Sequence, residues 1–193
     1  STLRARFAVA CFGVLGYELN LLDLNKDELD EIKEQIAFYK RYRNLFQQGK
    51  FYRGDDGNYA SWSVVSPDKK LSIGMVYCKR NRPNMGQYRF YAKGLKEDGL
   101  YLFSSTDIDH KIEEFGDLVN IASPIHIKQN SIAQKALSMA MSMKEKGENR
   151  RAFGDALMNA GIPLKQSFIS TGFDENIRLM TDNDARLYVM EMI

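Results

Sequence analysis

The stretch 12–53 constrains the fold more than any other, because it joins an alternating segment to one long amphipathic helix. In residues 15–21 apolar positions alternate with small or polar ones, which predicts a strand with one apolar face. Asn25 stands three residues before Glu28, a capping-box spacing that predicts the start of a helix. We expect this helix to end at Gly49. Its apolar stripe comprises Leu29, Ile32, Ile36, Tyr39 and Phe46.

The residues before this stretch predict a further helix, over 3–12, that is apolar on nearly all sides. A helix, a strand and a helix in that order form part of an α/β layer, but the single strand has no sheet to join. The chain also begins with Ser1 rather than methionine. We therefore expect an incomplete unit at the front of the chain, cut from a longer protein.

After Gly49 the pattern changes to short aromatic and β-branched runs separated by turn residues, which predicts an antiparallel meander or sandwich. The expected strands are 51–53, 60–65, 71–79, 87–95 and 100–104, then 125–127 and 186–192. Alanine, leucine and methionine at helical spacing predict a helix over 131–143. Residues 153–164 are interpreted as a one-turn helix leading into a strand.

The charge balance gives little reason to expect a nucleic-acid partner. Lysine and arginine number 27 against 25 acidic residues, a net charge of +2. The basic segments 40–43 and 79–82 are interpreted as a helix end and a hairpin tip.

No apolar run is long enough to predict a membrane span, and the first residues lack the order of a signal peptide. Cys11 and Cys78 are isolated and interpreted as structural thiols, so we expect a cytoplasmic protein.

Few residues suggest chemistry. His110 and His126 stand apart from other ligand types, so we expect no metal and no cofactor. Phosphate-binding loops and nucleophilic triads are also missing from the sequence. Glu18 and Asn20 share the polar face of the alternating segment; in a sheet closed into a barrel, this face approaches the mouth where ligands bind. They are weak candidates for substrate binding, and the alternative is two polar residues with a structural role.

Seven separated blocks of the sequence share one resemblance, and they are 4–19, 32–40, 49–53, 62–66, 123–129, 154–162 and 186–189. In this order they resemble the C-terminal third of α-galactosidases of glycoside hydrolase family 36. The resemblance implies that residues 1–48 are the last helix, strand and helix of a (β/α)8 barrel. It implies that residues 49–193 form a C-terminal antiparallel β-sandwich domain with an inserted helix, so the fold class is α+β.

The resemblance also bears on catalysis. A retaining glycosidase needs two carboxyl groups about 5 Å apart. In the family one aspartate follows a Lys-Trp pair and the other follows a serine, whereas here Trp62 is flanked by serines and no Ser-Asp dipeptide occurs. No catalytic residue is therefore assigned. The family tends to have aspartate where Asn20 stands, so a charge at that position is lost.

We therefore expect the parent protein to hydrolyse terminal α-galactosides of the raffinose or melibiose type in the cytoplasm. Its expected partners are the remainder of its own polypeptide, a galactoside substrate and further copies of itself, without nucleic acid or membrane. The competing interpretation is a non-catalytic module that binds carbohydrate or a neighbouring subunit. An exposed row of aromatic residues would serve that module, and its members would be Tyr88, Phe90, Tyr101 and Phe103.

Overall fold

A computed structural model describes residues 2–80, 88–111, 120, 126–128, 131–140, 142–165 and 182–193. Its helical elements are α1 (Leu3–Ala10), η1 (Leu21–Asp23), α2 (Lys26–Gln48), α4 (Ile132–Ala140) and the π-helical turn η3 (Ala156–Ala160). Its strands are β1 (Lys50–Asp55), β2 (Tyr59–Val65), β3 (Leu71–Cys78), β4 (Arg89–Phe90), β5 (Leu100–Ser104), β6 (Ile108–Lys111), β7 (Ser142–Glu145), β8 (Asn149–Phe153), β9 (Ile162–Pro163) and β10 (Asp184–Met192).

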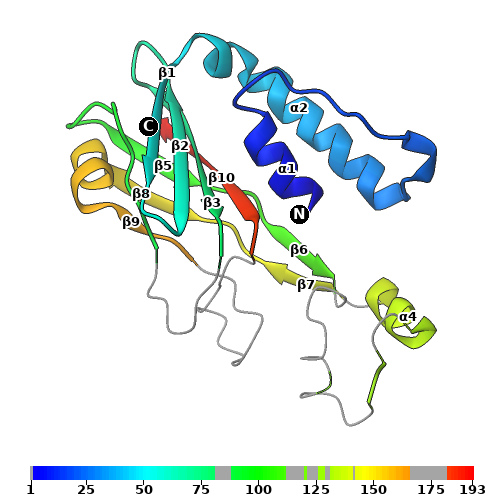
Figure 1. Cartoon of the computed structure of the whole chain (residues 1–193). Helices are drawn as coiled ribbons and strands as arrows, with labels where there is room; N and C mark the ends of the chain where they lie inside the picture. The colour runs from blue at the N-terminus through cyan, green and yellow to red at the C-terminus, as the bar shows by residue number, and fades with distance from the viewer. Residues whose placement is uncertain are drawn as a thin grey trace.

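A six-stranded antiparallel sheet is the centre of the described structure, with the order β1-β2-β3-β10-β5-β8. β1, β2 and β3 form the predicted meander. β10 comes last in the chain but lies between β3 and β5, so it joins the two halves of the sheet (Figure 1). Two-stranded ribbons, β4-β9 and β6-β7, complete the described strands.

One face of this sheet packs against α1 and α2, which lie side by side in Figure 1. Three rows of side chains cross β2, β3 and β10 on this face. The rows are Ala60–Tyr77–Ala185, Trp62–Met75–Leu187 and Val64–Ile73–Val189. The predicted alternation is confirmed, since the even-numbered residues of β2 and the odd-numbered residues of β3 in these rows share the face that the helices cover.

The opposite face is covered by the β4-β9 ribbon and η3. Phe90 of β4 packs beside Phe103 and Tyr188, with ring centroids 6.0 and 5.9 Å away. A glycine faces the Phe90 ring at position 74, where a Cβ would overlap it. The aromatic row expected to be exposed is therefore wrong: Phe90 is 1% exposed and Tyr101 and Phe103 are 0% exposed, while Tyr88 is half-buried. These rings lie between the six-stranded sheet and the layer formed by the β4-β9 ribbon and η3.

The long helix α2 begins as the capping box predicts. The Asn25 side chain accepts a hydrogen bond from the Glu28 N–H at 3.0 Å, and the Glu28 carboxylate accepts one from the Asn25 N–H at 2.9 Å. Its buried face carries Ile32, Gln35, Tyr39, Tyr42, Leu45 and Phe46. Gly49 ends the helix, because its N–H bonds to the Leu45 carbonyl at 2.8 Å.

Some predicted elements differ in the structure. The strand predicted over 15–21 is absent, because a strand needs a hydrogen-bonded neighbour and no described segment pairs with residues 15–20, while Leu21 begins η1. The strand predicted over 87–95 contracts to β4, and residues 126–128 are outside any strand. The predicted helix 131–143 corresponds to α4, and the predicted turn and strand within 153–164 correspond to η3 and β9. β6, β7 and β8 were not predicted.

A buried ion pair connects β10 to β7. The Arg186 guanidinium donates hydrogen bonds to both carboxylate oxygens of Glu145, one of them at 3.1 Å. Both side chains are buried. The pair fixes the β6-β7 ribbon, which projects from the sheet towards α4 in Figure 1.

Candidate functional site

The segment between α1 and α2 carries both residues that the sequence singled out. Two tyrosines attach it to α2: the Tyr39 hydroxyl donates to the Gly13 carbonyl at 3.1 Å, and the Tyr17 hydroxyl donates to Gln35 Oε1 at 2.6 Å. The Gln35 amide donates in turn to Glu31 Oε1 at 2.7 Å. One side of the segment is therefore held against the helix layer.

Glu18 and Asn20 lie on the other side of this segment. Leu15, Tyr17 and Leu19 are half-buried, whereas the residues between them are exposed. The predicted alternation is thus confirmed for residues 15–20 without the predicted strand, but it is wrong for Leu21, which lies in η1 and is 54% exposed. Glu18 and Asn20 share the exposed side.

Asn20 also has a local structural role. Its Oδ1 accepts a hydrogen bond from the Leu22 N–H at 3.2 Å, and its amide donates to Asp23 Oδ2 at 2.9 Å. These bonds cap the short helix η1. An amide has two N–H donors, so Asn20 retains a donor for a ligand while it caps the helix.

Tyr17 has a strongly shifted ionisation. Burial raises the pKa of Tyr17 to about 12, with a further contribution from the negative charge of Glu31. The hydroxyl therefore stays protonated at neutral pH and keeps its hydrogen bond to Gln35. Sequence reasoning missed this contact, although a glutamine among the apolar positions of the α2 stripe was a signal that a buried polar partner exists.

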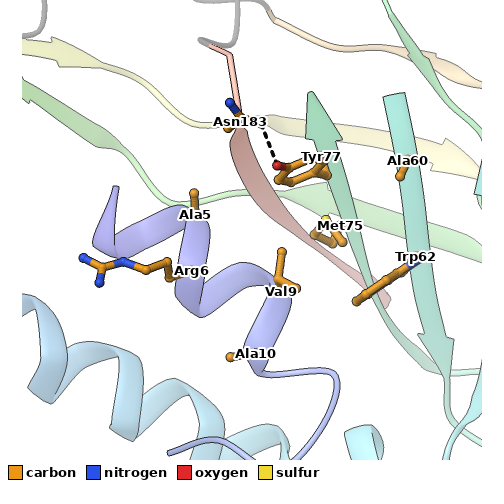
Figure 2. Close-up of a pocket in the computed structure, with 9 residues that line it drawn as sticks. All are labelled: Ala5, Arg6, Val9, Ala10, Ala60, Trp62, Met75, Tyr77 and Asn183. Carbon is orange, nitrogen blue, oxygen red and sulfur yellow. Dashed lines mark hydrogen bonds between the residues drawn. The ribbon is translucent and has the colours of Figure 1, made fainter. Parts of the chain in front are cut away.

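A groove of about 480 Å³ opens between α1 and the strands β2 and β3. Figure 2 shows Val9 of α1 pointing towards Met75 and Trp62 of the sheet across this groove, which Ala10 and Ala60 also line. At one end the Tyr77 hydroxyl donates to Asn183 Oδ1 at 2.9 Å. The groove combines apolar walls with one polar end, and no local pattern in the sequence predicts it.

The remaining candidates do not form a reactive site in the part of the chain that the structure describes. His126 is exposed, and the side chain of His110 lies outside the described set. The described residues contain no group of metal-ligating side chains and no helix long and apolar enough to cross a membrane. Burial raises the pKa of both Cys11 and Cys78, the latter to about 11, so neither thiol is a ready nucleophile.

The two basic segments have structural contacts. In the first, the Arg41 guanidinium lies 5.0 Å from the centre of the Tyr42 ring. In the second, Lys79 donates to the carboxylate of Asp55 at 2.8 and 2.6 Å, and residues 81–82 lie outside the described ranges. The first segment lies within the C-terminal part of α2, as predicted. β3 pairs with β2 and β10 and not with β4, so the structure does not support a hairpin between β3 and β4 at the second segment.

Comparisons with protein families divide the chain at the same place as the change in its pattern. Residues 59–190 match the glycosyl hydrolase family 36 C-terminal domain, and residues 1–49 match the melibiase family. The boundary between the two matches falls on β1.

Curated relatives and solved structures are similar over limited parts of their own length. Alpha-galactosidase 1 of Pediococcus pentosaceus is 40% identical over 80 residues, which are 40% of this chain and 11% of that protein. Alpha-galactosidase AgaA of Geobacillus stearothermophilus is 43% identical over 76 residues, which are 38% of this chain and 10% of that protein.

The crystal structure of the α-galactosidase from Lactobacillus brevis matches 100% of this chain with a TM-score of 0.67 and 34% identity, and the chain covers 20% of it. The α-galactosidase AgaB of Geobacillus stearothermophilus shares the fold, with a TM-score of 0.65 at 24% identity, over 100% of this chain and 20% of its own. The family match over residues 59–190 spans more than half of the chain, which therefore belongs to glycoside hydrolase family 36.

Proposed function

We propose that this chain is the C-terminal part of a retaining α-galactosidase that hydrolyses terminal α-galactosides of the raffinose or melibiose type. The observation that carries the proposal is the match of the whole chain to one fifth of an α-galactosidase structure at 34% identity. In this proposal residues 1–48 supply the last helix, strand and helix of a (β/α)8 barrel. Residues 49–193 supply the β-domain beside it, in which the segment that bears α4 is an insertion.

The geometry of residues 13–24 supports a place in a barrel. Residues 14–20 belong to no helix or strand, Tyr17 is hydrogen-bonded to Gln35 of α2, and no described segment pairs with their backbone. A parallel barrel strand takes both of its neighbours from other parts of the chain and has helices on its outer side. Val14 and Leu22 are 88% and 92% exposed here, and neighbouring barrel strands and loops would cover such side chains.

In this arrangement Glu18 and Asn20 face the barrel interior near its mouth. The Glu18 carboxylate can accept hydrogen bonds from sugar hydroxyls, and the Asn20 amide can donate one while it caps η1. The Tyr17–Gln35 and Tyr39–Gly13 hydrogen bonds hold the segment in position, so both polar side chains are presented on a fixed backbone. Neither residue takes part in cleavage of the glycosidic bond in this proposal.

The two carboxyl groups of the retaining mechanism come from the rest of the polypeptide. One attacks the anomeric carbon, and the other donates a proton to the leaving oxygen and then activates water. The reaction needs no metal or organic cofactor. We further propose that the enzyme acts in the cytoplasm as a homo-oligomer, and the isolated buried thiols Cys11 and Cys78 agree with a reducing compartment.

The test compares the complete polypeptide with the 193-residue chain on a chromogenic α-galactoside. We expect hydrolysis with retention by the complete polypeptide and none by the chain alone. Galactose release by the chain, at a rate that rises with its purity, would contradict the proposal. In the complete polypeptide, Glu18→Gln should raise KM, and Glu34→Gln on the exposed side of α2 serves as the control.

The competing module interpretation loses its support in the structure. An exposed aromatic row would have served it, but the rings of Phe90, Tyr101 and Phe103 are buried.

A further inference from the structure

The groove beside α1 is a surface that neither family match explains. Its helical wall belongs to residues 1–49, and its sheet wall belongs to residues 59–190. The groove therefore lies on the boundary between two units of the family. We propose that it is the seat of an apolar segment of the same polypeptide that precedes α1, which locks the barrel onto the β-domain; this inference rests on the function proposed above.

The walls of the groove favour a protein segment as the occupant. Val9, Trp62 and Met75 supply apolar surface, and the alanines at positions 5, 10 and 60 leave room for the close approach of a backbone. Arg6 also borders the groove, but its guanidinium points away from Trp62 and Met75 in Figure 2. Burial of aliphatic side chains is the gain that such a surface offers.

The greater length of the relatives indicates where the occupant comes from. This chain covers 20% of the Lactobacillus brevis α-galactosidase, so most of that polypeptide lies outside the matched part. α1 is the first element of the chain, and its first turn is fixed to the sheet: Arg4 Nη2 lies 3.3 Å from Asp184 Oδ2. Residues that precede α1 therefore start next to the groove and can pack in it without crossing the sheet.

The half-buried side chain of Trp62 marks where we expect the occupant to make contact. Its ring touches Phe12 and Phe51 edge to face, with centroids 5.9 Å away in both cases, and these rings continue the apolar surface beyond the groove. A segment that fills the groove would cover Trp62 and reach Phe51, which is 46% exposed. The expected occupant is thus a helix or extended stretch with leucine-like side chains at its contact positions.

Cysteine labelling tests the inference. Ala10→Cys and Ala60→Cys place a thiol on each wall, and the native Cys11 and Cys78 are buried, so they give little background. Asp98→Cys, in an exposed turn, is the control. In the 193-residue chain, at a dilution where it sediments as a monomer, all three introduced thiols should react with a maleimide at similar rates.

In the complete polypeptide we expect the two groove thiols to react at least tenfold more slowly, with the rate of the control unchanged. Equal rates in both proteins would overturn the inference, as would slow labelling of the groove thiols in the monomeric chain alone. Hydrolysis of a galactoside is measured on the same samples. If the complete polypeptide hydrolyses the galactoside but its groove thiols react rapidly, only the inference about the groove is refuted. If the complete polypeptide is inactive, the proposed function is refuted.

Discussion

Replacement of Gly74 by alanine tests how tightly the two layers of the β-domain pack. A Cβ at this position would lie 3.0 and 3.2 Å from two carbons of the Phe90 ring and closer still to a third. The Phe90 ring is 1% exposed and packs against both Phe103 and Tyr188, so it has little free space in which to move. The methyl group therefore forces the β4-β9 ribbon away from the sheet.

Two opposing terms set the size of the effect. Overpacking of a core costs about 1–3 kcal/mol. Loss of backbone freedom in the unfolded chain recovers about 0.4–1 kcal/mol when glycine becomes alanine. We expect Gly74→Ala to lower the free energy of unfolding by about 1–2 kcal/mol.

Urea unfolding of the 193-residue chain measures this loss, and the fluorescence of Trp62, its single tryptophan, reports on the transition. With a urea dependence of about 2 kcal/mol per molar, the midpoint should fall by roughly 0.5–1 M. Gly16→Ala is the matched control, because no atom lies within 4 Å of the added Cβ. In a Phe90→Leu background, Gly74→Ala should cost less.

The reasoning fails if Gly74→Ala unfolds at the same urea concentration as Gly16→Ala. It also fails if the cost of Gly74→Ala is unchanged when Phe90 is leucine, because the overlap would then have another cause. Thermal unfolding of the complete polypeptide provides the same comparison in the larger protein.

Further predictions concern the ion pair, the cap and the buried hydroxyl. Glu145→Gln leaves the buried Arg186 without its counter-charge and should cost about 3–5 kcal/mol in urea unfolding, while a Glu145→Leu/Arg186→Met double variant should recover most of this loss. Asn25→Ala removes the helix cap and should cost about 1 kcal/mol, whereas Asn25→Asp should be near neutral; equal losses would contradict the capping role. The unfolded chain ionises Tyr17 near its usual pKa and the folded chain at a pKa of about 12, so stability should fall from about pH 10 to about pH 12. Tyr17→Phe should weaken this decline, and an identical pH profile would refute the assignment.

Local signals in the sequence were sufficient for the helices and for the main meander. Asn25 and Glu28 are neighbours in sequence, and their bonds form within one turn, so the start of α2 could be predicted. Alternation likewise predicted which side chains of β2 and β3 share a face. It cannot tell which face is covered, and for this reason the aromatic row was assigned to solvent.

Contacts between distant residues could not be predicted. Alternation correctly placed Glu18 and Asn20 on one side, yet it could not supply the neighbours that would make residues 15–20 a strand. The pairing of Glu145 with Arg186 depends on the β6-β7 ribbon and the strand β10 of the main sheet, which the fold brings together. The groove beside α1 depends in the same way on the packing of α1 against β3 and β10.

The position of β10 has a consequence for synthesis of the protein. The meander β1–β3 and the pair β5–β8 can each form while the chain is still leaving the ribosome, but their strands are not paired with each other. Residues 184–192 emerge after both and pair with β3 on one side and β5 on the other. Until then β3 and β5 each have an unpaired edge on the side where β10 will bind. A stalled ribosome would therefore hold a chain with two exposed strand edges, which chaperones or proteases can recognise.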